Sequence, residues 1–303
     1  MIDKELNLKK LKTNNQHYDV WLHWDVTKRC NLDCEYCFGK ITDPKVKVNL
    51  IDIDKLMQTL DKTGKIFRVS FTGGEPTMIP NFIDAVKSIT KKHYVSFNTN
   101  LITKNLLQIV DEVNPKKILH IHASLHYNEL IKKSLLKIFI SNFKTLRQNG
   151  FNIYAEAVAY PPIKDEVDEI KTVMEKEKIE IGFAPFYGKF EERFYPESYT
   201  ESELRIFGLT IADIKCHTQK EALCNAGYNA AVVFSNGNVY PCHQIKEKIG
   251  NIYERINFSK GLIKCPSKRC GCPLNKYDEY LFDKSDTILL NEIYSVELKP
   301  KQK

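Results

Sequence analysis

The sequence lacks any long apolar run. No stretch approaches the ~20 apolar residues that a membrane-spanning helix needs, and the first residues, MIDKELNLKKLK, carry charges where a secretion signal would be apolar. Internal repeats and low-complexity linkers are also missing. We therefore expect a cytoplasmic globular protein with no membrane partner.

A block of charge of one sign is missing too. Lysine and arginine number 45 against 38 aspartates and glutamates, but these basic residues are spread along the chain without interleaved aromatics of the RNA-binding kind. The net charge of +7 therefore favours a solvated basic surface over a nucleic-acid partner. RNA modification stays as a further alternative, and it would require salt-sensitive binding of tRNA.

Cysteine is absent between residues 38 and 215, although the chain of 303 residues contains nine. Three lie close together, at Cys30, Cys34 and Cys37. The other six are Cys216, Cys224, Cys242, Cys265, Cys270 and Cys272. Thiols stay reduced in the cytoplasm, so two such clusters indicate metal binding or catalysis rather than disulfides.

What the chain does contain is a regular alternation of strand and helix patterns. Strand patterns occupy residues 19–27, 66–71, 94–99, 117–125, 152–160 and 179–184. Helical patterns occupy residues 53–64, 79–93, 103–113 (with Thr103 as N-cap), 128–149 and 163–178. Strict alternation predicts a parallel sheet with right-handed crossovers, and six units are too few to close an eight-stranded barrel. The predicted fold class is α/β, a partial (β/α)6 TIM-like barrel.

Beyond residue 185 the pattern changes. Two strand patterns joined around Asn236-Gly237 predict a β-hairpin within 230–242. We expect five segments along the chain: a lead-in at 1–18, the partial barrel at 19–185, a connecting segment at 186–222, a small Cys-rich module of hairpin plus helix at 223–275, and a helix with a basic tail at 276–303.

The first cysteine cluster, CNLDCEYC, directly follows the first predicted strand, at the end of the sheet where such folds place their chemistry. Thiolates bind zinc or iron–sulfur clusters, and a closed zinc site takes four ligands. No fourth ligand presents itself nearby, since His23 belongs to the preceding strand. A [4Fe–4S] cluster held by three cysteines instead keeps one iron open to a ligand from outside the protein.

This motif resembles the CxxxCxΦC signature of the radical S-adenosylmethionine (SAM) enzymes, with Tyr36 as the aromatic Φ. The resemblance implies that Cys30, Cys34 and Cys37 bind a [4Fe–4S] cluster whose open iron is chelated by SAM. It implies further that an electron donor such as flavodoxin or ferredoxin reduces the cluster. SAM is then cleaved to methionine and a 5′-deoxyadenosyl radical, which abstracts hydrogen from substrate.

A second motif of the family, TGGEP at 72–76, follows the second predicted strand. Gly73 and Gly74 carry no side chains, so backbone groups there can approach a ligand closely. By resemblance, this segment, which includes Glu75 and Pro76, binds the amino group of SAM.

Two further positions are implied by a fainter similarity. The segment FNTN at 97–100 resembles the family's TNG-type segment and implicates Asn98, but Leu101 replaces the glycine. Ser124 matches a position at which the family places a polar contact to SAM.

Glu156 lies inside an otherwise apolar strand pattern. By the period of two it points inward, where a charge needs a partner, so we expect a polar cavity beside the cofactor. His120 and His122 share one strand face with Ser124 and form a candidate row facing substrate. Their spacing without carboxylates makes a poor metal site.

The second cysteine set resembles the SPASM and twitch modules, which are auxiliary-cluster extensions of the same family. Their opening, CxnGx4C, matches Cys224, Gly237 and Cys242. The resemblance implies a second, auxiliary [4Fe–4S] cluster. Its expected ligands are Cys224, Cys242, Cys270 and Cys272, with Cys265 as an alternative ligand.

Cys216 has two interpretations, since it is either a ligand of that cluster or a thiol that donates hydrogen to a substrate radical. Zinc on four of the six later cysteines is the alternative to an auxiliary cluster.

The auxiliary module makes modification of a peptide or protein the first functional prediction, as a crosslink, a thioether or an epimerisation. The alternative is a dehydrogenase or epimerase of a small sugar, nucleotide sugar or aminocyclitol, which the shortness of the chain favours.

Overall fold

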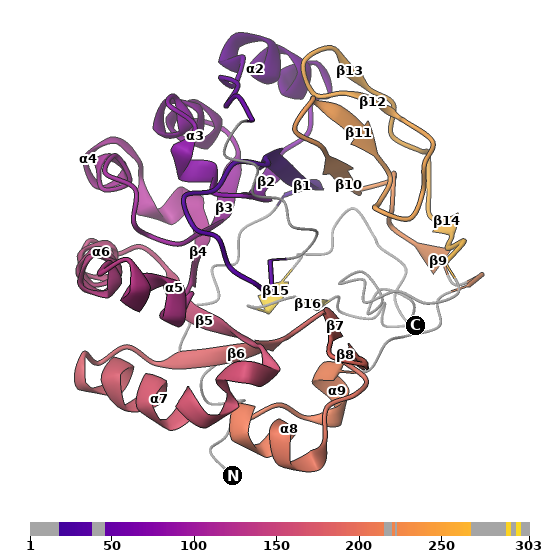
Figure 1. Cartoon of the computed structure of the whole chain (residues 1–303). Coiled ribbons are helices and arrows are strands. Elements are labelled where there is room, and N and C mark those ends of the chain that lie inside the picture. The colour runs from indigo at the N-terminus through magenta and orange to yellow at the C-terminus, as the bar shows by residue number, and fades with distance from the viewer. Residues whose placement is uncertain are drawn as a thin grey trace.

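A ten-stranded sheet forms the centre of the protein, with the strand order β13-β12-β11-β10-β1-β2-β3-β4-β5-β6. The computed structural model describes residues 18–37, 46–214, 220–221, 223–267, 289–291 and 295–297. Strands β1 to β6 pair in parallel along the chain, with helices between them on the outer side of a curved sheet (Figure 1). The two ends of the sheet, β13 and β6, are not neighbours in the strand order, which confirms the predicted partial barrel.

The elements of the barrel lie close to their predicted positions. Its strands are β1 (Val20–Thr27), β2 (Phe67–Gly73), β3 (Tyr94–Thr99), β4 (Ile118–Ser124), β5 (Ile153–Ala159) and β6 (Ile181–Pro185). Its helices are α2 (Ile53–Lys62), η2 (Pro76–Met78), α3 (Phe82–Thr90), α4 (Gln108–Glu112), η3 (Pro115–Lys117), α5 (Tyr127–Lys132), α6 (Leu136–Gln148), η4 (Pro161–Glu166) and α7 (Val167–Lys176).

The part after β6 consists of short elements. The connecting segment contains β7 (Gly188–Phe190), β8 (Arg193–Tyr195), α8 (Glu201–Phe207) and α9 (Ile211–Ile214). It is followed by β9 (Leu223–Cys224), β10 (Ala230–Val233), β11 (Asn238–Tyr240), β12 (Gly250–Asn251), β13 (Arg255–Ile256) and β14 (Ile263–Lys264).

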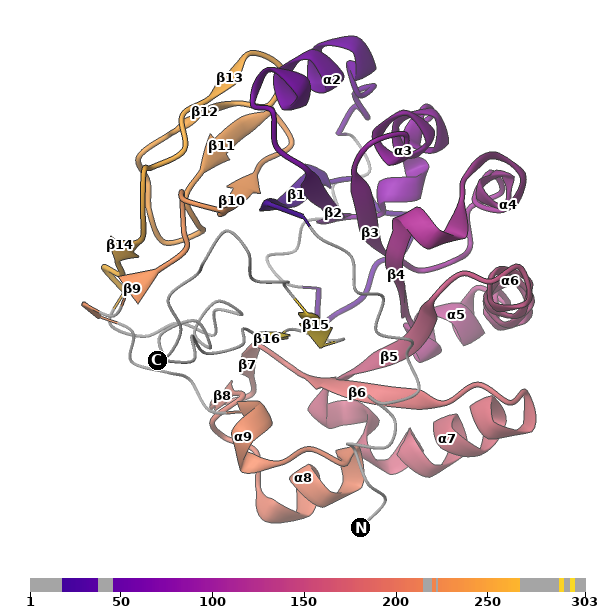
Figure 2. The same cartoon turned by 180° about the vertical axis from the view of Figure 1, so that it is seen from behind.

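The predicted hairpin is present, and it is continuous with the barrel sheet. β10 and β11 pair antiparallel, while β10 also pairs in parallel with β1, from Trp21 opposite Ala230 to Trp24 opposite Val233. Figures 1 and 2 show the hairpin extending the barrel sheet beyond β1. An edge strand leaves a row of backbone groups unpaired, so β10 satisfies the free edge of β1. Within 223–267 the described residues form strands and turns, and the predicted helix of this module does not lie there.

The two faces of the sheet differ in polarity. On β1, Val20, Leu22 and Trp24 are buried toward the helices, whereas Trp21 and His23 alternate onto the inner face. Closed barrels fill that inner face with branched apolar side chains. Here it carries serine, histidine, arginine and glutamate side chains that contact one another across neighbouring strands. The fold therefore provides a polar interior for chemistry.

Two predicted helices differ from the observed ones. The pattern at 128–149 forms α5 and α6 rather than one helix, because Ser134 between them adopts a left-handed φ of 58°. Thr103 does not cap a helix: its hydroxyl donates to Thr77 Oγ1 at 2.7 Å, and the regular helix α4 begins only after Leu107.

The ends of the chain are described only in part. Tyr18 belongs to the described residues, and the rest of the predicted lead-in lies outside them. Within 276–303, where a helix and tail are predicted, the described residues form two antiparallel strands, β15 (Leu289–Asn291) and β16 (Ser295–Glu297). The other residues of 276–303 lie outside the described ranges, and the helix there stays a prediction. Among the helices of the described ranges, each is too short or too polar to cross a bilayer.

Candidate active site

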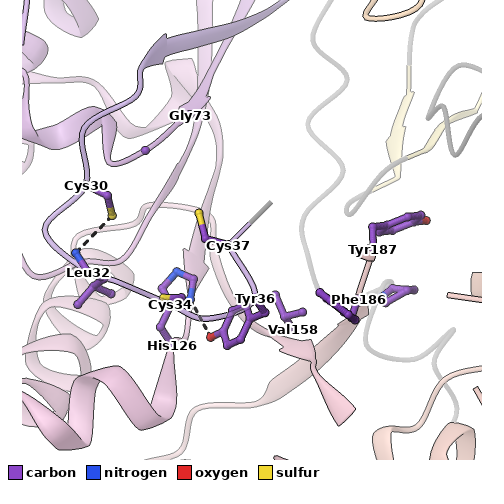
Figure 3. A pocket seen from close by; sticks show the side chains of 12 residues that line it. Cys30, Leu32, Cys34, Tyr36, Cys37, Gly73, His126, Val158, Phe186 and Tyr187 are labelled. Carbon is purple, nitrogen blue, oxygen red and sulfur yellow. Dashed lines mark hydrogen bonds between the residues drawn. The ribbon is translucent and has the colours of Figure 1, made fainter. Parts of the chain in front are cut away.

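The loop after β1 brings its three cysteines to one cavity. Cys30, Cys34 and Cys37 line a space of about 410 Å³ together with Gly73 and Gly74 (Figure 3). The remaining lining residues are Leu32, Tyr36, His126, Val158, Pro185, Phe186 and Tyr187. Burial raises the pKa of Cys30 to about 11 and that of Cys34 to about 12, so a metal that binds them must displace their protons.

Hydrogen bonds from neighbouring segments hold this loop. Asn100 Nδ2, after β3, donates to Asn31 Oδ1 at 2.6 Å. Glu129 Oε2, on α5, accepts the backbone N–H of Asp33 at 3.2 Å. Of these positions, sequence reasoning placed Asn100 in a motif without giving it a role, and it missed Asn31 and Glu129. A polar residue after each strand is the signal that could have identified Asn100.

The glycines of TGGEP make room for the cysteine loop itself. A Cβ on Gly73 would lie 2.3 Å from Thr27 O, and one on Gly74 would lie 2.1 Å from Arg29 O. The backbone N–H of Gly74 donates to Thr27 O at 2.7 Å, and that of Glu75 donates to Arg29 O at 2.8 Å. The close approach that the structure shows is that of the loop backbone, and the contact of this segment with SAM stays a prediction.

The carboxylate of Glu75 accepts hydrogen bonds from neighbouring protein groups. It is 1% exposed and sits at the start of η2, which Pro76 opens. Its donors are Thr77 N (3.1 Å), Thr77 Oγ1 (2.5 Å), Thr99 Oγ1 (2.8 Å) and Asn100 N (2.7 Å). Burial raises the pKa of Glu75, and these hydrogen bonds oppose that shift. Glu75 thereby joins the loop after β2 to the loop after β3.

Leu101 stands in a strained conformation. Its φ is 60°, in the left-handed region that favours glycine, and its side chain is fully buried. The departure of FNTN from the TNG pattern therefore has a backbone cost, which the buried leucine side chain offsets. Asn98, two residues before this motif ends, donates to Thr72 Oγ1 at 3.4 Å on the inner face.

Glu156 faces one buried histidine at ion-pair distance, although neither facing atom makes a hydrogen bond within the described residues. His122 Nε2 lies 3.3 Å from Glu156 Oε2, and both side chains are at most 9% exposed. The His122 ring stacks on Tyr154 with centroids 4.9 Å apart. Ser124 is the register neighbour of Glu156 on the adjacent strand. His120 turns instead toward Arg68, so the predicted histidine row serves two different contacts.

An aromatic wall closes one side of the cavity. The hydroxyl of Tyr36 lies 3.0 Å from His126 Nδ1, and the two rings stack (Figure 3). Tyr160 lies 5.2 Å from Tyr36 and 5.1 Å from Phe186, measured between ring centroids. Tyr160 and Phe186 were not anticipated from the sequence, because their role depends on loops that meet only in the fold.

Three of the later cysteines lie at one apolar cluster. Cys224 is 6% exposed in an apolar cluster with Tyr18 and Leu119, against which Cys242 and Cys265 pack. Strands β9 and β14 create this arrangement, because Ile263 pairs with Cys224. The predicted ligands Cys270 and Cys272 lie outside the described residues, as does Cys216.

The donor set of the loop after β1 fits an iron–sulfur cluster. No disulfide joins the described cysteines. Within the same ranges, no three His, Cys, Asp or Glu side chains are placed to hold one metal ion. A [4Fe–4S] cluster takes each thiolate on a different iron, so its ligands stand further apart than those of one ion. Three reduced thiols around a cavity fit that requirement.

Comparison with known proteins agrees with this chemistry. The family described as the Radical SAM superfamily matches residues 24–175. A tungsten-containing aldehyde ferredoxin oxidoreductase cofactor-modifying protein of Pyrococcus furiosus is 32% identical over 31% of this chain and 28% of its own length. The antilisterial bacteriocin subtilosin biosynthesis protein AlbA of Bacillus subtilis is 22% identical over 80% of this chain and 59% of its own length. The chain thus spans 28% and 59% of these two relatives.

Solved structures show the same fold. Streptococcus suis SuiB bound to SAM superposes with a TM-score of 0.54 at 19% identity, covering 82% of this chain and 66% of that chain. The protein anSMEcpe with bound AdoMet and the Cp18Cys peptide superposes with a TM-score of 0.53 at 16% identity, covering 77% of each chain. The likeness extends past the barrel.

Proposed function

This chain belongs to the radical SAM superfamily, and on that premise we propose that it abstracts hydrogen from a peptide or protein substrate. The observation that carries the proposal is the meeting of Cys30, Cys34 and Cys37 with Gly73 and Gly74 at one cavity. Among the described lining residues, His126 carries a nitrogen that could bind a metal, and the hydroxyl of Tyr36 is hydrogen-bonded to its Nδ1. Three thiolates therefore leave a coordination position for SAM.

The chain's own residues hold this site in place. A bound [4Fe–4S] cluster supplies one-electron cleavage of SAM, which generates the radical that abstracts hydrogen. Cys30, Cys34 and Cys37 would hold the cluster, while Asn100 and Glu129 orient the loop that carries them. Tyr36, Tyr160 and Phe186 exclude water from one wall of the cavity, which protects a reactive radical.

The second site is proposed to hold an auxiliary [4Fe–4S] cluster. Cys224, Cys242 and Cys265 converge on one apolar cluster, which supports Cys265 as a ligand rather than an alternative. The fourth ligand would come from Cys216, Cys270 or Cys272. If Cys216 is not that ligand, its proposed role is that of a hydrogen donor. Iron and sulfide contents of about eight per chain support two clusters, and about four with bound zinc contradicts the second.

A peptide substrate is favoured by the relatives. SuiB has been solved bound to the precursor peptide SuiA, and AlbA is named for biosynthesis of the bacteriocin subtilosin. The proposed partners are therefore a peptide and a cytoplasmic one-electron donor such as flavodoxin or ferredoxin.

Reconstitution under anaerobic conditions tests the proposal. The loaded full-length chain is incubated with SAM and dithionite, and 5′-deoxyadenosine is measured by chromatography. We expect formation of 5′-deoxyadenosine in the wild type and its loss in Cys30→Ala. Short peptides encoded beside the gene are then added, and mass spectrometry reports a modified product.

Two negative outcomes distinguish the proposed radical chemistry from the proposed peptide substrate. No 5′-deoxyadenosine from a chain with full iron content contradicts radical SAM chemistry. Cleavage of SAM that accelerates with nucleotide sugars or aminocyclitols, and not with peptides, contradicts the peptide substrate.

A further inference from the structure

Arg68 is a buried cation near the start of β2. Its side chain is on the inner face of the sheet, and the residue is 5% exposed. In the described part of the chain, its guanidinium has no ion pair with a carboxylate; the buried carboxylate of the inner face, Glu156, pairs with His122 instead. An isolated buried charge is costly unless an opposite charge lies nearby.

Within the described ranges, Arg68 contacts neutral groups only. Its hydrogen-bond partners are Ser70 Oγ (3.0 Å) and Ser96 Oγ (3.2 Å) through Nε, Tyr18 OH (3.5 Å) through Nη1 and His120 Nε2 (3.5 Å) through Nη2. The guanidinium also lies 4.8 Å from the centre of the Trp21 ring. Burial raises the pKa of Tyr18, and burial together with Arg68 lowers the pKa of His120, so both stay uncharged at neutral pH. None of these neighbours compensates the charge.

Arg68 and the second cysteine set share neighbouring residues. Arg68 stands in register between Trp21 on β1 and Tyr94 on β3. Both aromatic side chains pack against the apolar cluster that contains Cys224, and Tyr18 is a member of that cluster. The hydrogen-bond partner of Arg68 and its two register neighbours therefore all contact the group of residues that gathers Cys224, Cys242 and Cys265.

We propose that Arg68 is the counter-charge of the auxiliary cluster held by Cys224, Cys242 and Cys265. This inference rests on the proposed auxiliary cluster. Four thiolates make such a cluster an anion, and its reduction by one electron from a donor makes it more negative. A cation at short range stabilises the reduced form more than the oxidised form and raises the reduction potential. Arg68 and Tyr18 are each 5% exposed, so solvent screens this charge weakly.

Arg68 would act on the auxiliary cluster through the electric field of its charge, without touching substrate. The test is therefore a measurement of the reduction potential of that cluster. Anaerobic redox titration with electron paramagnetic resonance compares the loaded full-length wild type with Arg68→Met, which removes the charge, and Arg68→Lys, which keeps it. We expect the midpoint potential of the auxiliary cluster to fall in Arg68→Met and to fall less in Arg68→Lys. The cluster at Cys30, Cys34 and Cys37 keeps its potential. Arg205→Met, on the exposed face of α8, is the matched control and shifts neither potential.

A second measurement covers the case in which Arg68→Met does not load iron. The variant Cys224→Ala is expected to lose the auxiliary cluster, which is the anion proposed to balance Arg68. The charge of Arg68 is then uncompensated. Adding Arg68→Met to Cys224→Ala then raises the melting temperature, whereas a fall overturns the proposal, because it shows that the neutral partners alone sustain the arginine.

Two further outcomes are decisive. Unchanged potentials in loaded Arg68→Met overturn the proposal, and unchanged potentials with weaker substrate binding assign Arg68 to an anionic group of the substrate. A wild-type chain with about four irons contradicts the auxiliary cluster of the proposed function. The role of Arg68 then falls with that cluster, whereas the first cluster is unaffected.

Discussion

The two cysteine sites lie at opposite ends of β1, roughly 25 Å apart along the strand, and they are built on different principles. Cys30, Cys34 and Cys37 line a cavity, on a loop fixed by hydrogen bonds from Asn100 and Glu129. Cys224 is buried in an apolar cluster beneath the barrel. The first arrangement suits a cluster that must admit a ligand, and the second suits one that must be kept from solvent.

The largest expected effect comes from removing one thiol at each end. Cys34→Ala and Cys265→Ala should each lower the iron content from about eight to about four per chain. Cys34→Ala abolishes formation of 5′-deoxyadenosine, whereas Cys265→Ala keeps it and loses the modified product. Iron analysis and chromatography measure both. Full iron content in Cys265→Ala would remove this residue from the ligand set.

A smaller effect is expected where the two loops of the first site touch. Gly74→Ala places a Cβ 2.1 Å from Arg29 O, so the base of the cysteine loop must move. A displacement of ~1 Å at a reacting site can cost about 10²-fold in rate, and we expect 5′-deoxyadenosine formation to fall by that order. Gly261→Ala, whose Cβ would have nothing within 4 Å, is the control. Equal rates in the two variants would contradict the role given to Gly74.

The strain at Leu101 predicts that a glycine variant is more stable than an alanine variant at this position, the reverse of the order expected inside a helix. Both Leu101→Ala and Leu101→Gly lose a buried side chain, at about 2–5 kcal/mol. Glycine also relieves the left-handed backbone, so Leu101→Gly should be more stable than Leu101→Ala by about 1 kcal/mol. At Leu60, buried within α2, alanine should be the more stable by about 1 kcal/mol. Chemical denaturation measures both pairs, and the same order at both sites would argue against strain.

The smallest effect concerns the scaffold that both sites share. His93 Nδ1 accepts the backbone N–H of Phe67 at 3.3 Å, and burial lowers the pKa of His93 to about 4. The unfolded chain binds this proton near pH 6.5, so the contribution to stability is full above that pH and is lost as the pH falls toward 4. His93→Gln should flatten the melting temperature between pH 7 and 5. An unchanged slope would show that other groups set it.

Much of the barrel could be predicted from local pattern, because each strand and helix carries its own periodicity. The sequence reasoning placed β1 to β6 within about two residues, and it brought Cys30–Cys37 and Gly73–Gly74 to one end of the sheet. The left-handed turn at Ser134 escaped it, since serine carries no such signal. The pairing of β10 with β1 escaped it as well, because contacts between distant strands leave no trace in either segment alone.

Other features of the sites were beyond local pattern for the same reason. Arg68 is one basic residue in a strand, and only the register with Trp21 and Tyr94 reveals what it faces. Glu75 belongs to a motif, but its bonds to Thr99 and Asn100 come from the next loop. Roles that depend on two neighbouring strands become visible only once the strands are paired.

The pairing of β1 with β10 also means that, during synthesis, β1 must wait for a partner that is translated much later. β1 leaves the ribosome well before its partner β10 (Ala230–Val233), because most of the barrel lies between them in the chain. At about 5–20 residues per second, the wait is on the order of 10–40 s. During that interval a strand rich in valine, leucine and tryptophan has one edge without its native neighbour. The nascent chain is therefore most prone to aggregate until residue 233 emerges, and faster elongation should improve its soluble yield.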